Sequence, residues 1–202
     1  KDASQLKKQN FQIDEGTGSI ILLFVANPNQ APFDNKLVRQ AVYRAVDRNS
    51  MVKAAWNGVS KPVTLPWVPN SPAYDSATDQ KYGYDLAAAK TLLEQSGINP
   101  GAIPISLLTY GALPEVVASA QILKADLEKL GMKVNIDPRD PAAFEDVYGK
   151  GNYQMAATGV GNVQKFPTRI STNTMFRTQD NPVLKSKIFP EYLAAIDTVN
   201  TT

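Results

Sequence analysis

Apolar residues along this chain follow two different spacings, and the changes between them divide it into strands and helices. The run SIILLFVAN at 19–27 is continuously apolar and rich in β-branched residues, which predicts a buried strand. Asn27 and Pro28 end it, because proline cannot continue a hydrogen-bonded ladder. Further strands are predicted at 103–110, 132–138 and 153–161.

Helical spacing is clearest between residues 33 and 58. One apolar stripe repeats every three or four positions and is formed by Leu37, Val38, Ala41, Val42, Ala45 and Val46. Asp34 or Asn35 can cap this helix, and Asp47 can cap a second helix that Gly58 ends. Other helices are predicted after Asp85, from Pro114 to Gly131, over 141–151 and over 190–199.

Two stretches show no clear period, at 59–84 and at 162–189. The first is predicted to be an irregular loop, and its tryptophan and tyrosines favour an ordered one. Strands alternating with helices predict an α/β domain with a mixed β-sheet flanked by helices. The strand–helix–strand unit at 103–137 is expected to make a right-handed crossover.

The amino-acid composition argues against several classes of function. The 202 residues carry a net charge of +2 with scattered basic residues, which gives no electrostatic case for nucleic acid. Without histidine or cysteine, the usual zinc, copper and haem ligands and the Ser–His–Asp nucleophile are absent. No calcium-loop motif appears, and no apolar run is long enough to span a membrane. We therefore expect no metal and no cofactor.

Candidate catalytic motifs are weak. Gly159 and Gly161 could belong to a dinucleotide fingerprint, but Gln164 stands where its third glycine should be. Asp137, Glu145 and Asp146 are interpreted as surface carboxylates, because nothing beside them suggests a raised pKa. The chain is therefore predicted not to be an enzyme.

Aromatic residues are better candidates for ligand contact. Tyr110 lies at the carboxyl end of a predicted strand, where ligands gather in open α/β sheets, and Trp67 lies in the long loop. Packing in the core or anchoring of a loop is the alternative role for each of them.

Three stretches in order resemble the motifs of family 5 extracellular solute-binding proteins of ABC importers, which include the dipeptide-, oligopeptide- and nickel-binding subunits. They are PFDNKLVRQAVYRAVDRNSMVKAAWNGVSKP, YDLAAAKTLLEQSG and AQILKADLEKLGMKVNID, and they cover most of residues 20–160. In the first, the matching positions are Pro32, Phe33, Arg39, Ala41, Ala45, Val46, Asp47, Arg48 and Gly58.

The resemblance implies a lobe of the periplasmic-binding-protein type II kind, from a two-lobed protein that closes on its ligand. Residues 19–202 would form a truncated second, C-terminal lobe, and residues 1–18 a segment entering from the missing first lobe. The implied partners are a small-molecule solute (a peptide, an oligosaccharide or a small anion) and a membrane permease. The protein would be a monomer, periplasmic or lipid-anchored at the cell surface. The alternative is a sensor or chaperone-like module of the same fold without transport.

The resemblance also implies where a ligand would bind. The cleft loops would follow strands 103–110 and 153–159, and the implied ligand-binding residues are Trp67, Tyr110, Gly111, Gly159, Gly161, Asn162 and Lys165. Peptide-binding members place an aspartate in the second loop to hold the peptide's amino group, whereas this chain reads GVGNVQKFPTRIST. Lys165 would instead favour an anionic or polyhydroxylated ligand if it faces the cleft rather than solvent. Arg39 and Arg48 would have structural roles.

Overall fold

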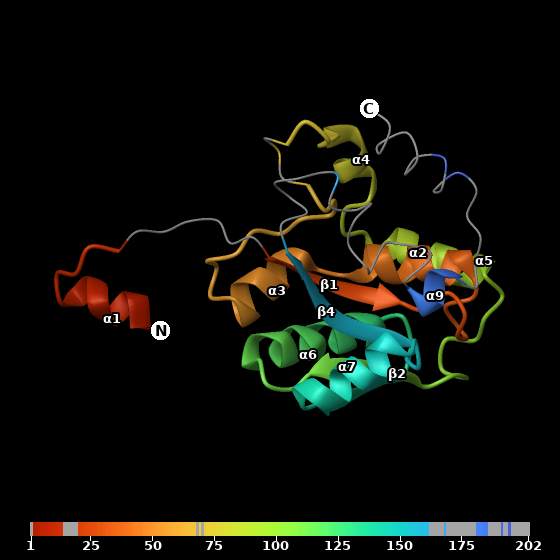
Figure 1. The fold of residues 1–202 in the computed structure, drawn as a ribbon. Helices are drawn as coiled ribbons and strands as arrows, with labels where there is room; N and C mark the ends of the chain where they lie inside the picture. The colour runs from red at the N-terminus through yellow and green to blue at the C-terminus, as the bar shows by residue number, and fades with distance from the viewer. Residues whose placement is uncertain are drawn as a thin grey trace.

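The computed structural model describes residues 2–13, 20–67, 69, 71–161, 168, 181–185, 191 and 194. The strands are β1 (Ile20–Ala26), β2 (Ile105–Tyr110), β3 (Val134–Arg139) and β4 (Met155–Gly161). The helices are α1 (Asp2–Lys8), α2 (Lys36–Ala45), α3 (Arg48–Ala55), α4 (Ser76–Lys81), α5 (Leu86–Gln95), α6 (Pro114–Glu128), α7 (Pro141–Gly149) and α9 (Pro182–Lys185) (Figure 1).

All four strands join one mixed sheet in the order β1-β4-β2-β3. β2 runs parallel to both β3 and β4, with Leu107 opposite Met155, and β1 runs antiparallel to β4, with Ile20 opposite Gly161. The carboxyl ends of β2, β3 and β4 therefore lie along the same edge of the sheet. This arrangement confirms the predicted mixed α/β fold and its four strands.

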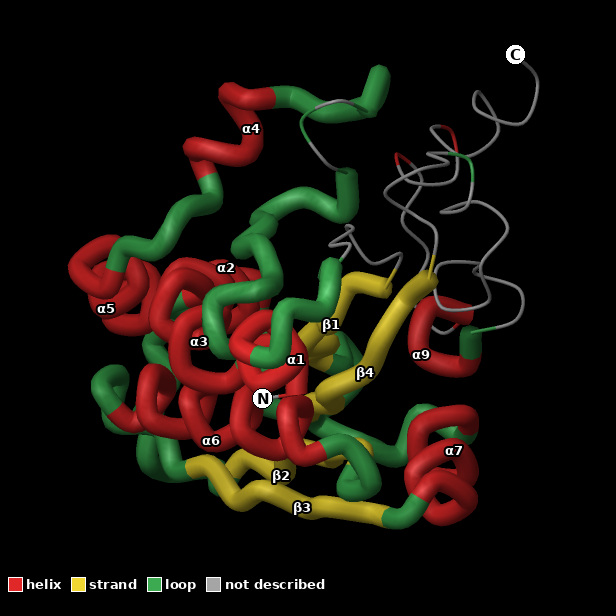
Figure 2. Tube along the Cα trace, turned by 90° about the vertical axis from the view of Figure 1, so that its left-hand side faces the viewer, coloured by secondary structure: helices red, strands yellow, loops and turns green. Residues whose placement is uncertain are grey.

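Helices cover both faces of the sheet, as Figure 2 shows with α2, α3, α5 and α6 on one side and α7 and α9 on the other. The larger core cluster joins the first group to one sheet face through side chains such as Val38, Leu107 and Leu123. A smaller cluster joins Leu108, on the opposite face of β2, to Phe144 of α7 and Val183 of α9. The alternation of side chains along β2 separates the two cores.

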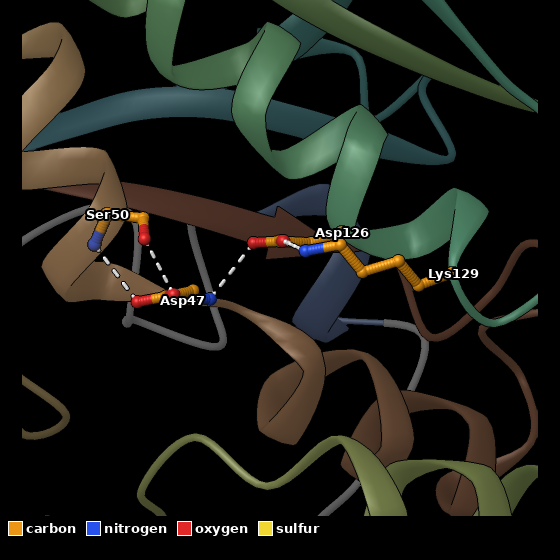
Figure 3. A network of polar contacts seen from close by, with 4 residues as sticks. All are labelled: Asp47, Ser50, Asp126 and Lys129. Carbon is orange, nitrogen blue, oxygen red and sulfur yellow. Dashed lines mark hydrogen bonds and ion pairs between the residues drawn. The ribbon is translucent and has the colours of Figure 1, made fainter.

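The α2–α3 pair is held by the capping residues that the sequence suggested. Asn35 Oδ1 accepts from the Leu37 N–H at 2.8 Å, and Asp47 Oδ1 accepts from the Ser50 N–H at 3.0 Å. The Asp47 N–H in turn donates to Asp126 Oδ2 of α6 at 3.0 Å, so the turn between the two helices is tied to a third (Figure 3).

Both arginines of the α2–α3 motif have structural contacts. Arg39 donates to the backbone carbonyls of Phe33 and Asp34, at 2.6 and 3.2 Å. Arg48 donates to the carbonyls of Tyr43 and Val46. The Arg48 bonds satisfy carbonyls at the carboxyl end of α2, which the helix itself leaves without partners, and the Arg39 bonds tie α2 to the turn that precedes it.

Replacing Asp47 with asparagine is expected to change how the free energy of unfolding depends on pH at acidic pH. Backbone and side-chain hydrogen bonds from Ser50 lower the pKa of the Asp47 carboxyl in the folded protein. The stability from its charge is therefore fully present above the unfolded pKa of about 3.9, and it is lost as the pH falls through the folded pKa. Since asparagine caps about as well as neutral aspartic acid, the wild type should be more stable at pH 6 by up to about 1 kcal/mol, and the difference should disappear once the pH is below the folded pKa. Urea midpoints across this range measure the effect, and a difference independent of pH would contradict it.

The structure corrects one prediction within 59–84. This stretch is not wholly irregular, because it contains the six-residue helix α4, which Asp75 caps by accepting from the Thr78 N–H at 2.9 Å. The pattern missed α4 because none of its residues is buried, so it has no apolar stripe.

Near the carboxyl terminus, the structure describes only part of what was predicted. The short helix α9 falls in the stretch that showed no clear period. Within the helix predicted over 190–199, only Glu191 and Ala194 are described, and both are helical. Over the described ranges, no helix combines the length and the apolar character that a membrane span requires.

Candidate functional site

The candidate site is the sheet edge where β2, β3 and β4 reach their carboxyl ends. β4 extends beyond its last pairing with β2, at Ala157, and residues 158–161 pair with β1 alone. Tyr110 and Gly111, at the end of β2, therefore lie on the same edge as Gly159 and Gly161. The structure thus brings together the two strand ends that the sequence had separated by about fifty residues.

Tyr110 packs inward rather than standing free at this edge. Its ring meets Phe144 of α7 edge-to-face, with centroids 5.2 Å apart, and it joins the smaller core cluster. Phe144 stacks in turn on Tyr148 at 5.5 Å. Tyr110 therefore anchors the end of β2 to α7, which is the packing role that the sequence left open, and it remains only half-buried.

Gly111 is required by a close approach between two backbones. Its N–H donates to the Arg139 carbonyl at 2.8 Å, which continues the β2–β3 pairing past the end of the strands. A Cβ atom at position 111 would lie 2.9 Å from that same oxygen. Gly111 therefore sets the path of the loop that leads into α6.

We expect Gly111→Ala to destabilise the protein by about 1–3 kcal/mol, because a backbone oxygen cannot move aside as a flexible side chain can. Gly161→Ala is the matched control, since a Cβ there meets nothing within 4 Å. Its effect should stay below about 1 kcal/mol. Urea unfolding of both variants tests this, and equal losses at the two positions would contradict the role given to Gly111.

Gly159 and Gly161 lie where the tips of β1 and β4 meet the long loop. A Cβ at Gly159 would lie 3.1 Å from Cγ2 of Ile20, whose side chain is 72% exposed. Val63 packs against the cluster of Ile21 and Val160. The loop that precedes α4 therefore reaches the candidate site, which the sequence pattern alone could not show.

Trp67 follows Val63 by four residues in this loop. Its side chain is partly buried, and its indole N–H is fully buried with no hydrogen-bond acceptor in the described part of the chain. A buried donor without a partner is rare and costs free energy, so it commonly marks a position that a further group completes.

The charges at this edge are mostly paired within the protein. Arg139 ends a parallel strand, a position that could have marked it from the sequence as a residue of this edge. It donates from Nε to Asp137 Oδ1 at 2.7 Å, and this contact raises the arginine pKa. Asp140 caps α7 by accepting from the Ala143 N–H at 3.0 Å. Glu115, in the first turn of α6, is exposed. Asn162 and Lys165, the other predicted ligand residues, lie outside the described residues.

The structure also contains a hollow away from the predicted site. A groove of about 300 Å³ lies near the amino ends of β2 and β4, and it is lined by Gln30, Ser106, Leu108, Asp137, Val147, Asn152, Tyr153 and Gln154. It contains none of the predicted ligand residues. No group of three or more acidic side chains that could hold a metal ion occurs within the described ranges.

Comparisons with known proteins place this fold in a family. The heme-binding protein A of Haemophilus influenzae is 32% identical over 127 residues, which is 61% of this chain and 23% of that protein. The glutathione-binding protein GsiB of Pectobacterium atrosepticum is 29% identical over 153 residues, 75% of this chain and 29% of the relative. The chain therefore spans about a quarter of the length of these relatives.

A solved structure agrees with the sequence comparisons. The periplasmic binding protein DppA of Helicobacter pylori, in complex with the peptide STSA, superimposes with a TM-score of 0.81 and 23% identity. The alignment covers 99% of this chain and 39% of DppA, and it shows a shared fold. The family described as bacterial extracellular solute-binding proteins, family 5 Middle, matches residues 1–182. The chain belongs to the family 5 extracellular solute-binding proteins, a family that binds solutes rather than one of enzymes.

Proposed function

We propose that this chain is the ligand-recognising lobe of an extracellular solute-binding protein that serves an ABC importer. It would hold a small polar solute in a cleft closed by the rest of the protein and deliver it to the permease. One observation carries the proposal: a chain of this family brings the ends of β2 and β4 to one edge of its sheet. That edge is where open α/β sheets bind ligands.

Each predicted residue has a role in this proposal. Gly161, where a Cβ would meet nothing within 4 Å, would let the solute approach the backbone closely, and Gly111 and Gly159 would shape the strand ends beside it. The buried indole N–H of Trp67 would donate to an oxygen atom of the solute. Tyr110 would bound the cleft while its ring remains packed on Phe144. Asn162 and Lys165 would add polar contacts from the loop after β4.

The proposed solute carries an anionic or polyhydroxylated group. Lys165 would supply a positive charge after β4, where the family resemblance implies a carboxylate in peptide-binding members. Asp137 and Asp140 are both engaged within the protein, which leaves them poorly placed to hold a peptide's ammonium group. Glutathione, which the Pectobacterium relative is named for binding, is a peptide with two carboxylates and fits this class.

The remaining features of the proposal concern where and how the protein would act. The protein would act outside the cytoplasm, either free in the periplasm or lipid-anchored, as a monomer and without turning over its solute. A cleft formed by two walls binds weakly when one is missing. The full-length protein is therefore the form to test.

The test is a thermal-shift screen of the full-length protein against glutathione, neutral tripeptides, oligosaccharides, heme and small anions, confirmed by calorimetry. A ligand at a hundredfold excess over its Kd stabilises the folded state by about 2.7 kcal/mol. We expect anionic or hydroxylated solutes to give the largest shifts.

Two variants locate the charge that recognises the solute. Lys165→Gln should weaken binding of an anionic solute about tenfold or more, because a hydrogen bond to a charged group contributes about 1.5–3 kcal/mol. Lys53→Gln, at an exposed position on α3, should leave binding unchanged. Strong binding of neutral tripeptides that Lys165→Gln does not affect would contradict the proposed solute class. A protein that binds none of these solutes would contradict the proposed function.

A further inference from the structure

One carboxylate of α4 connects this helix to the loop that precedes it. Asp79, on α4, accepts from the Thr64 hydroxyl through one oxygen and from the Tyr74 hydroxyl through the other, the second at 2.9 Å. Thr64 is fifteen residues away in sequence, so these bonds fold residues 59–84 back on themselves. Hydrogen bonds from Thr64, followed by those from Tyr74, hold the Asp79 pKa below its ordinary value. The hydroxyls therefore donate to an anion at neutral pH, which makes the stronger kind of hydrogen bond.

The same threonine is held from the other side by α2. The Tyr43 hydroxyl donates to the Thr64 carbonyl. The Tyr43 ring lies under the Arg48 guanidinium, 4.5 Å from its centroid, and meets Tyr82 edge-to-face at 5.7 Å. Tyr43 is thus fixed by two neighbours, and Thr64 is fixed between α2 and α4.

Thr64 lies next to the residues that reach the candidate site. Val63 packs against Ile21 and Val160 at the tips of β1 and β4. Trp67, three residues after Thr64, carries the buried indole N–H that has no acceptor among the described residues. We call residues 63–67 the loop wall. Within the described part of the chain, Thr64 makes the hydrogen bonds that join the loop wall to α2 and α4.

We propose that Asp79 is a positioning residue for solute binding. Its carboxylate accepts a hydrogen bond from Thr64, a contact that we call the clasp, and thereby holds the loop wall against the ends of β1 and β4. This inference rests on the proposed function, because it assigns Asp79 a role at the same site. Asp79 itself touches no solute. Without the clasp, the loop wall would occupy its binding position in only a fraction of the molecules, and the apparent Kd would rise in proportion.

The position of the loop wall can be measured without any solute. Lys61 is exposed, and Gly161 has open space around it, so cysteines introduced at both positions can carry nitroxide labels. The 202 residues contain no cysteine of their own to compete in this region. In the full-length protein at pH 7, pulsed electron spin resonance should show one narrow distance distribution between the labels. Asp79→Ala and Thr64→Val should each at least double its width.

One control and two further variants separate the clasp from general effects. Glu94→Gln removes one negative charge from an exposed position on α5 and should leave the distribution unchanged. If Asp79→Ala does not fold, Thr64→Val and Tyr74→Phe decide the question, because each removes one hydroxyl donor and keeps the carboxylate. An unchanged width in the folded clasp variants, or equal broadening in Glu94→Gln, would overturn the proposal.

Glutathione serves as the probe for the binding consequence. If the clasp variants hold the loop wall in place in about one molecule in ten, calorimetry should show its Kd raised about tenfold. A merely structural role would lower the melting temperature and leave Kd unchanged, and that outcome would overturn the proposal. If the wild type binds no solute at all, the proposed function fails, while the label distances still decide whether Asp79 holds the loop wall.

Discussion

Replacing Asp126 with alanine is expected to lower the free energy of unfolding by about 3 kcal/mol. The Asp126 side chain is only 3% exposed, yet it is charged and lies on the buried face of α6. It accepts from the Asp47 N–H at 3.0 Å and from Lys129 Nζ at 2.6 Å (Figure 3). Removing the carboxylate leaves the partly buried Asp47 N–H without its acceptor and opens a cavity, and each loss costs about 1–3 kcal/mol.

The ion pair between Asp126 and Lys129 contributes less to stability than the hydrogen bond from the Asp47 N–H. Lys129 is 48% exposed, so its ammonium group can turn to water when Asp126 is removed. Asp126→Asn keeps an oxygen that can accept from the Asp47 N–H, and it should cost about 1–2 kcal/mol. The comparison between the alanine and asparagine variants therefore separates the hydrogen bond to Asp47 from the charge.

An exposed ion pair provides the control for Asp126. Asp146 contacts Lys150 at 2.6 Å with both side chains about 60% exposed, and Asp146→Ala should change stability by less than about 1 kcal/mol. Urea unfolding measures all three variants. An Asp126→Ala loss no larger than that of Asp146→Ala would show that the buried carboxylate does not stabilise the junction of α2, α3 and α6.

Replacing Phe144 with alanine should cost about 3–5 kcal/mol, the largest effect expected in this chain. Phe144 is 1% exposed and lies between the rings of Tyr110 and Tyr148, with centroids at 5.2 and 5.5 Å. Its removal leaves a cavity in the smaller core cluster and removes the support of Tyr110 at the end of β2. Phe144→Leu keeps most of the volume and should cost less than about 2 kcal/mol.

Amide hydrogen exchange shows where the effect of Phe144→Ala acts. Exchange at residues 108–113 should accelerate more than exchange in α2, which packs in the larger cluster on the other face of the sheet. Uniform acceleration across both clusters would contradict a local role for Phe144. A loss below 2 kcal/mol for the alanine variant would show that Tyr110 and Tyr148 close the space that the ring leaves.

The sequence alone determined the features that depend on neighbouring residues. Asp47 and Asp85 cap their helices because the carboxylate and the N–H groups that it accepts from lie within three positions. Gly58, Gly97 and Gly131 follow helices with φ values of +73°, +70° and +81°, the left-handed conformation that glycine adopts at least cost. Family membership also followed from the sequence, because each of its motifs is a continuous stretch of the chain.

Only the tertiary structure decided which residues meet across the chain. The rule for parallel strands placed Tyr110 at the ligand edge, but the docking of α7 turned its ring onto Phe144. Asp126 interrupts an apolar helix face. Its role is visible only in the folded structure, where it accepts from the N–H of Asp47, 79 residues away. Helix α4 has no apolar stripe, and its carboxylate at Asp79 binds a hydroxyl from the distant Thr64. Caps and turns are set by local geometry, whereas these contacts depend on how the sheet and helices pack.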